Sequence, residues 1–259
     1  MKILRNKYFL FFLGFLFLLG IWFLLSAIYD VNSMIFPSPY DTFVLMFKLL
    51  GEKSTYGYLG FSLIRLLIGF GVSVILAFLF GILVNNNESL YQFFTPIMTF
   101  LKAAPTATFV FLFVTIFTGK NAPVFVVIVM SFPILYESVV GALKSTDQNV
   151  LEASKIDGAG RLKTLIKVQI PLGIPYISVG FISTFALAFK VEIMAEIITG
   201  ITKGGIGTMM NLSQILNPTD MTPMFAYSLI AILLILIVQL IATILKQRLL
   251  NIHENGSAI

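Results

Sequence analysis

The sequence predicts an all-α integral membrane protein, and three observations support this fold class. Of its 259 residues 58% are hydrophobic and only 11% are charged, whereas in a soluble domain about 25% are charged. The mean hydropathy is +0.97. Apolar runs recur along the chain, each with roughly the 20 residues that a helix needs to cross about 30 Å of hydrocarbon. Six such transmembrane helices are expected, within one membrane domain that spans residues 1–259.

The first two expected spans are separated by a mixed segment. Residues 8–29 form the first span, because Tyr8–Leu25 carries no charge and no small-x-small cleavage site follows it. Residues 30–58 form an outer segment, in which two prolines precede a short amphipathic helix over Thr42–Leu50. The second span follows over residues 59–84.

The other four spans are interrupted by short polar segments and by one longer one. They are expected over residues 93–117, 123–143, 172–201 and 224–245. Pro105 in the third span and Pro133 in the fourth predict bent or broken helices, which neighbouring helices can accommodate.

The distribution of basic residues predicts the orientation. Ten of them fall on the side of the N-terminus and four on the other side, which is the positive-inside bias. The ten are Lys2, Arg5, Lys7, Lys144, Lys155, Arg161, Lys163, Lys167, Lys246 and Arg248, and the four are Lys48, Lys53, Lys120 and Lys203. Both termini and the loop 144–171 are therefore expected in the cytoplasm. This placement accounts for much of the net charge of +5, and nucleic acid is not expected as a partner.

Several kinds of chemistry are excluded or disfavoured by residue types. The chain has no cysteine and only one histidine, His253 in the polar tail, so neither a metal site nor cysteine or histidine catalysis is expected. It lacks a GxxxxGK[ST] loop, so it is not expected to bind ATP in that manner. Lys203 followed by Gly204–Gly207 lacks the strand–loop–helix context of a phosphate cradle and is interpreted as a turn. The chain is not expected to be an enzyme.

The loop 144–171 contains the most informative motif. Ser145 and Gln148 have the spacing of a capping box and predict a helix over Gln148–Asp157. One face of this helix is built mainly of small side chains, including Ala153 and Ser154. Such a face suits insertion into a groove of another protein, although an ordinary amphipathic loop at the membrane surface has the same composition.

The end of this loop is predicted from glycine and proline. Gly158 is expected to adopt the left-handed conformation that closes a helix. A second helix follows, with apolar residues on one side and Lys163 and Lys167 on the other. Pro171 is expected to stop that helix and to reorient the chain into the fifth span.

This interval resembles the EAA loop of ATP-binding-cassette (ABC) import permeases, which reads Glu-Ala-Ala, three residues, Gly, nine residues, Ile-x-Leu-Pro. Glu152, Ala153 and Ser154 stand for the first three residues, Gly158 falls at the required spacing with Ala159 after it, and Val168, Ile170 and Pro171 stand for the last three. Ser154 replaces the second alanine of the pattern. The resemblance implies that Glu152, Ala153, Ser154, Gly158, Ala159 and Pro171 couple the chain to an ATPase.

Other segments resemble the nitrate/sulfonate/taurine branch of these permeases. They are Phe36–Pro39, Ser62–Arg65, Ala104–Thr106, Phe132–Ile134, Phe189–Glu196 and Gly204–Gly207. The resemblance implies the type I importer fold in a bacterial cell membrane, with a permease dimer of identical chains. It also implies a cytoplasmic ATPase dimer that binds ATP and Mg²⁺, and an extracytoplasmic substrate-binding protein. Substrates of this branch and its relatives include sulfonates, nitrate and thiamine-precursor pyrimidines.

Five ionisable residues fall within the expected spans, where an ionised group is costly unless it is paired or reached by water. They are Arg65, Glu137, Lys190, Glu192 and Glu196. Glu192 and Glu196 share a helix face, whereas Lys190 does not. These residues either line a pore or gate, or form ion pairs between helices. Acidic residues on a pore would repel an anionic substrate, so a neutral or cationic substrate also stays open.

Two function classes remain. The first is the permease subunit of an ATP-driven importer for a small solute. The second is an ion-coupled secondary transporter or channel that uses Glu192, Glu196 and Arg65 as an ion relay. The EAA-like loop favours the first, because a secondary transporter has no use for an ATPase-docking helix. In both classes the many aromatic side chains are expected mostly to contact lipid and neighbouring helices.

Overall fold

The computed structural model describes residues 7–28, 36–117, 121–200 and 204–256, and within these ranges it contains no strand. Among the described helices, five are long and apolar enough to cross a membrane, and one bent pair would make a sixth span. This confirms the predicted all-α membrane fold. Four of the basic residues from which the orientation is predicted lie outside the described residues, namely Lys2, Arg5, Lys120 and Lys203.

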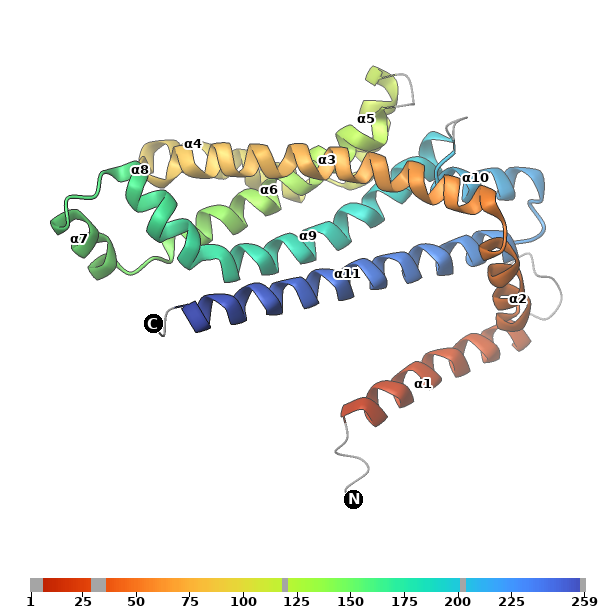
Figure 1. Ribbon diagram of the computed structural model, residues 1–259. Helices are drawn as coiled ribbons and strands as arrows, with labels where there is room; N and C mark the ends of the chain where they lie inside the picture. Colours follow the sequence, from red (N-terminus) through yellow and green to blue (C-terminus); the bar gives the residue numbers. More distant parts are fainter. Residues whose placement is uncertain (1–6, 29–35, 118–120, 201–203, 257–259) are drawn as a thin grey trace.

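The helices run in the order seen in Figure 1, with α7 and α8 at one end of the bundle and α2 and α10 at the other. Their bounds are α1 Lys7–Ile28, α2 Pro39–Leu50, α3 Lys53–Asn85, α4 Glu88–Ala103, α5 Thr106–Phe117, α6 Ala122–Lys144, α7 Gln148–Ile156, α8 Arg161–Thr164, the π-helix η2 Leu165–Gln169, α9 Ile170–Thr199, α10 Ile206–Leu216 and α11 Thr222–Gly256. The end of α11 and the helix α7 lie at the same end of the molecule.

The centre of the bundle is formed by α3, α6 and α9, which approach each other closely at small residues. A Cβ atom added at Gly81 of α3 would lie 2.7 Å from Val139 Cγ1 of α6. A Cβ atom added at Gly173 of α9 would lie 3.0 Å from the Cβ atom of Ala142, also on α6. Small residues let helix backbones come together in this way and gain dispersion contacts. The three helices therefore form one closely packed block.

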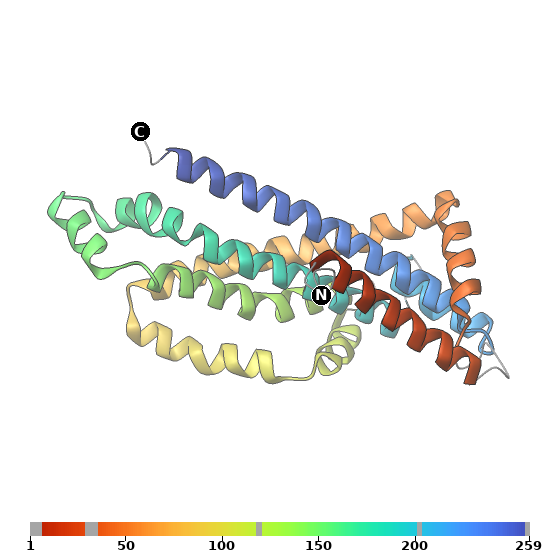
Figure 2. The same ribbon diagram turned by 90° about the horizontal axis from the view of Figure 1, so that it is seen from below.

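The third predicted span, 93–117, is not one straight helix. It is divided into α4 and α5, which are bent by 93° at the break and lie along one side of the bundle in Figure 2. Ala104 has an extended backbone, with φ −69° and ψ 135°. The following Pro105 explains this, because the proline ring disfavours the helical conformation for the residue before it. The predicted break is therefore present, and it is sharp.

One predicted helix start and one predicted helix cap need correction. The helix α2 begins at Pro39, three residues before the expected Thr42, because Ser38 is its N-cap and proline suits the first helical turn. The helix α7 begins at the predicted Gln148, but its N-cap is Asp147, whose Oδ1 accepts a hydrogen bond of 2.8 Å from the Asn149 amide. The predicted capping box at Ser145 was wrong, because the Ser145 hydroxyl donates back to the Ala142 carbonyl at the end of α6.

The expectation that Pro171 stops a helix was also wrong. The chain is helical without interruption from Arg161 through Thr199, as α8, η2 and α9. In η2 the hydrogen bonds shift by one residue, so that the Ile170 amide donates to the Leu165 carbonyl. The wider turn lets Pro171, which has no amide hydrogen to donate, occupy the first turn of α9 without breaking the helix.

The first helix is attached to the rest of the chain mainly by one aromatic residue. Trp22 of α1 donates a hydrogen bond of 3.0 Å to the Pro37 carbonyl, and its ring packs against Phe43 and Phe225. Most large apolar side chains of α1 are otherwise exposed, and α1 lies beside the bundle in Figure 1. Exposed apolar surface of this kind suits contact with lipid.

Candidate functional site

The residues of the EAA-like loop that are expected to couple to an ATPase differ in exposure. Glu152 and Ala153 are exposed on α7, whereas Ser154 is buried. The Ser154 and Thr164 hydroxyls are hydrogen-bonded at 2.8 Å, so Ser154 holds α7 against α8. The residue that departs from the Glu-Ala-Ala pattern thus makes a side-chain contact that alanine could not make. The exposed surface of α7 contains the other two residues.

Gly158 closes α7 in the way that the sequence predicts. Its φ is +71°, in the left-handed region, and an added Cβ atom would meet nothing within 4 Å. The requirement for glycine is therefore conformational and not steric. The amide of the next residue, Ala159, donates to the Ser154 carbonyl at 3.0 Å, which completes the turn between α7 and α8. Pro171 lies beyond this turn, at the start of α9.

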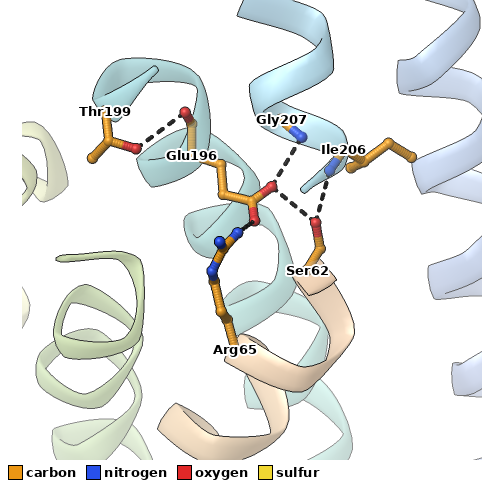
Figure 3. A network of polar contacts seen from close by, with 6 residues as sticks. All are labelled: Ser62, Arg65, Glu196, Thr199, Ile206 and Gly207. Atoms are coloured by element: carbon orange, nitrogen blue, oxygen red, sulfur yellow. Dashed lines mark hydrogen bonds and ion pairs between the residues drawn. The ribbon is translucent and has the colours of Figure 1, made fainter. Parts of the chain in front are cut away.

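A buried polar network joins α3, α9 and α10 at the other end of the bundle (Figure 3). The Glu196 carboxylate of α9 forms an ion pair with Arg65 of α3, and it accepts hydrogen bonds from the Ser62 hydroxyl at 2.8 Å and from the Gly207 amide at 3.0 Å. The Ser62 hydroxyl in turn accepts a hydrogen bond of 2.9 Å from the Ile206 amide. Glu196 is fully buried, so each of these contacts offsets part of its desolvation.

The turn that leads into α10 fits closely around this carboxylate. A Cβ atom added at Gly205 would overlap the carboxylate of Glu196, and one added at Gly207 would lie 2.5 Å from the Ile193 carbonyl oxygen. Only glycine lets the backbone reach Glu196 at these two positions. The sequence Gly204–Gly207 was interpreted as a turn, and Gly205 is indeed the N-cap of α10.

The other ionisable residues of the predicted spans differ from Glu196 in burial or in partners. Glu192, one turn before Glu196, is fully buried, and its carboxylate oxygens have no hydrogen-bond partner among the described residues. Glu137 of α6 pairs instead with Lys102 of α4, and both side chains are exposed. Lys190 is exposed on α9 and forms no ion pair with the described residues.

Lys190 lies beside a cavity of about 230 Å³ between α9, α10 and α11. Its lining is largely apolar, with Met210, Met224 and Ser228 among the residues that surround it. The exposed ammonium group and the buried carboxylates of Glu192 and Glu196 therefore belong to different faces of the same helix.

Sequence reasoning missed the neutral partners of these sites. Ser62 was noted only as part of a family resemblance, and Gln169 was not noted at all. Gln169 lies in η2, where its amide nitrogen donates to the Leu143 carbonyl at 3.4 Å and its amide oxygen accepts from Asn85 at 3.0 Å. A glutamine among apolar residues close to a proline was the available signal, because a buried amide needs partners.

The comparisons with known proteins agree with this architecture. Residues 69–251 match the family described as the binding-protein-dependent transport system inner membrane component. The chain belongs to this family. It is thus a multi-pass membrane permease of an ABC import system, as its fold and its EAA-like loop suggested.

Individual relatives are more distant. A probable ABC transporter permease of Brucella melitensis is 26% identical over 71% of this chain and 74% of its own length. The bicarbonate transport system permease CmpB of Synechococcus elongatus is 31% identical over 56% of this chain and 52% of its own. The nitrate import permease NrtB of Leptolyngbya laminosa is 24% identical over 58% and 54%. Among solved structures, a bacterial ABC transporter involved in alginate import superimposes with a TM-score of 0.61 at 18% identity, over 93% of this chain and 96% of that one.

Proposed function

We propose that this chain is the translocating subunit through which a cytoplasmic ATPase dimer drives the import of a small anion by alternating access. The observation that carries the proposal is α7, a nine-residue helix at one end of the bundle that presents Glu152 and Ala153 to solvent. A second, identical permease chain and an extracytoplasmic binding protein complete the transporter. ATP and Mg²⁺ are bound by the ATPase.

The mechanism begins with docking of α7 in a groove of the ATPase. Glu152 supplies a charged contact, and the small side chain of Ala153 permits close approach. When ATP binding closes the two ATPase subunits, α7 moves with its subunit. Because α8, η2 and α9 form one continuous helical stretch, that movement reaches the membrane-spanning α9 directly. Rigid-body rotation of α9 with its neighbours then changes access to the pathway.

The anionic substrate is inferred from the different exposure of charges on α9. Glu192 and Glu196 are fully buried, so they do not place negative charge on an accessible surface. Lys190 is exposed within the span, where an ammonium group is costly in lipid and is best placed on a water-filled path. For Glu192 and Glu196, the expectation that acidic residues would repel an anion therefore loses its basis, and the exposed Glu137 is paired with Lys102. The bicarbonate and nitrate permeases among the relatives support the same substrate class.

The alternative of an ion-coupled carrier or channel is less well supported. An ion relay through Arg65 and Glu196 needs groups that water or an ion can reach. Glu196 is instead fully buried and held by Arg65, Ser62 and the amide of Gly207, an arrangement that suits a fixed tie between helices.

The test is substrate-stimulated ATP hydrolysis by this chain with its partner ATPase and binding protein in lipid vesicles. Bicarbonate, nitrate, a sulfonate, glycine betaine and a pyrimidine precursor are added in turn. We expect one of the anions to stimulate hydrolysis. Stimulation by betaine or the pyrimidine alone would contradict the anion assignment, and failure of the ATPase to associate would contradict the importer role.

Lys190 provides a sharper version of this test. In the Lys190→Gln variant we expect uptake of the anion at low concentration to fall roughly tenfold. This is the lower end of the range by which protein charges raise the association rate of an oppositely charged substrate. Lys190→Arg keeps the charge and should retain most of the uptake. Equal uptake by the Gln variant and the native chain would remove Lys190 from the pathway.

A further inference from the structure

At the end of the bundle that carries α7, the helices are joined by a set of buried or half-buried neutral side chains, which we call the polar link. Its members are Ser154 of α7, Thr164 of α8, Gln169 of η2 and Asn85 of α3, together with the Leu143 carbonyl of α6. The Ser154–Thr164 contact ties α7 to α8. Gln169 then reaches two further helix ends at once, because its amide accepts from Asn85 and donates to the Leu143 carbonyl.

The position of Gln169 along the chain makes this arrangement specific. It is the last residue of the π-helix η2, directly between the segment that carries α7 and the spanning helix α9. The wider π turn rotates the side chains that follow it relative to a regular α-helix, and such turns are frequent at functional sites. Gln169 is buried, so its amide group must be hydrogen-bonded to protein partners in order to avoid a desolvation cost.

The three helices that meet at Gln169 are the ones that pack most closely. Small residues bring α6 against α3 at Gly81 and against α9 at Gly173. At Gly69, a Cβ atom added to α3 would lie 2.8 Å from Val127 Cγ1 of α6. Closely packed interfaces deform little and move as units. A displacement delivered to the ends of these helices is therefore carried along their whole length.

We propose that Gln169 is a positioning residue that transmits the displacement of α7 to the ends of α3, α6 and α9 simultaneously. The inference rests on the proposed function, in which α7 is moved by the ATPase. Without Gln169, α7 would still pull on α9 through the chain, but α3 and α6 would no longer receive the movement at the same point. Because its partners are neutral, the link can break and form again within the transport cycle at modest cost.

The test compares the native chain and Gln169→Leu in the complete transporter, reconstituted in lipid vesicles with the ATPase, the binding protein and the stimulating solute. The quantity measured is the number of solute molecules imported per ATP hydrolysed. Leucine fills a similar volume without hydrogen-bonding groups. We expect this ratio to fall roughly tenfold, within the usual range of coupling between sites. An unchanged ratio would overturn the proposal, including the case in which import and hydrolysis fall together.

Two further variants separate coupling from folding. Gln169→Glu keeps the oxygen that accepts a hydrogen bond from Asn85 and loses the group that donates to the Leu143 carbonyl. The number of solute molecules that this variant imports per ATP should therefore lie between the values for the native chain and for Gln169→Leu. Asn85→Leu should also lower the number of solute molecules imported per ATP, and combining it with Gln169→Leu should add little, because Gln169→Leu already removes the contact with Asn85. Fully additive effects would contradict a shared link.

The matched control is Gln92→Leu, which replaces an exposed glutamine of α4 by the same residue. Its ratio should equal that of the native chain, and an equal loss in this control would count against a specific role of Gln169. Failure of the proposed function itself is recognised differently. In that case the native chain would show no solute-stimulated hydrolysis at all, whereas failure of the link alone leaves the native chain coupled and Gln169→Leu indistinguishable from it.

Discussion

The two ends of α9 are held to their neighbours by different chemistry. Toward α10, Glu196 is tied to Arg65 by an ion pair and to Ser62 and Gly207 by hydrogen bonds, all around a fully buried carboxylate. Toward α7, Gln169 makes two hydrogen bonds between neutral groups. Removing one partner from a buried charged network costs about 3–5 kcal/mol. A neutral hydrogen bond contributes about 0.5–1.5 kcal/mol.

This difference suggests different roles for the two ends. The charged end is expensive to open, because Glu196 and Arg65 would each lose a partner while they remain desolvated. It is suited to fix α3, α9 and α10 as one body. The neutral end is suited to follow a partner that moves, since its contacts can be exchanged at low cost. We infer that α9 has an anchored end at the Glu196 network and an adjustable end at the polar link.

The largest expected effect comes from breaking the charged end. Glu196→Leu leaves Arg65 without its carboxylate, and we expect the free energy of unfolding to fall by about 3–5 kcal/mol. Denaturation of the purified chain in mixed detergent micelles measures this. The double variant Arg65→Leu/Glu196→Leu should recover part of the loss, because the guanidinium that lost the Glu196 carboxylate is removed as well. If Glu196→Leu lowered the free energy of unfolding by less than about 1 kcal/mol, the charged contacts at this end of α9 would stabilise it no more than the neutral contacts at the other end.

A smaller effect is expected where the backbone approaches the same carboxylate. In Gly205→Ala the new Cβ atom would overlap the carboxylate of Glu196, which must then move. We expect a destabilisation of about 1–3 kcal/mol, as for other overpacked sites. Gly60→Ala of α3 is the control, since an added Cβ atom there meets nothing within 4 Å. Alanine favours a helix over glycine by about 0.5–1 kcal/mol, so this control should be neutral or stabilising.

The smallest effect is expected at the adjustable end. Ser154→Ala removes one hydroxyl and leaves that of Thr164 without its partner. We expect a loss of about 1 kcal/mol, measured by the same denaturation. The double variant Ser154→Ala/Thr164→Val removes both hydroxyls and should lie closer to the native chain than the sum of the single variants. If the two single effects simply add, the two hydroxyls do not stabilise each other.

Much of the fold follows from the sequence because its signals are local. Runs of apolar residues identified the spanning helices, and the left-handed Gly158 followed from its position after a short helix. Features that depend on a neighbouring helix were not predicted. The Ser145 hydroxyl donates a hydrogen bond to α6 and does not cap α7. Pro171 does not end the helix because a π turn precedes it, and no local sequence pattern predicts that turn.

The residues of the candidate sites also differ in how well they could be predicted from the sequence. Ionisable residues within apolar runs are conspicuous, so Glu196 and Arg65 could be identified from the sequence although their pairing could not. Neutral residues such as Gln169 and Asn85 give a weaker signal, because both lie just outside the predicted spans and an uncharged amide there is common until its partners are known. The exposure of Lys190 and the burial of Glu192 also depend on how α9 is rotated about its axis in the bundle. Residue spacing shows which residues of α9 share a face, but it does not show which face is buried.

Docking of α7 on an ATPase can be tested directly, because the chain has no cysteine. A single cysteine introduced as Ala153→Cys would be unique in the chain, and Asn217→Cys places one just after α10 at the opposite end of the bundle. Each variant is treated with a short thiol–amine crosslinker in vesicles that contain the complete transporter. We expect a crosslink to the ATPase from position 153 and none from position 217. A crosslink from 217, or none from 153, would contradict this docking.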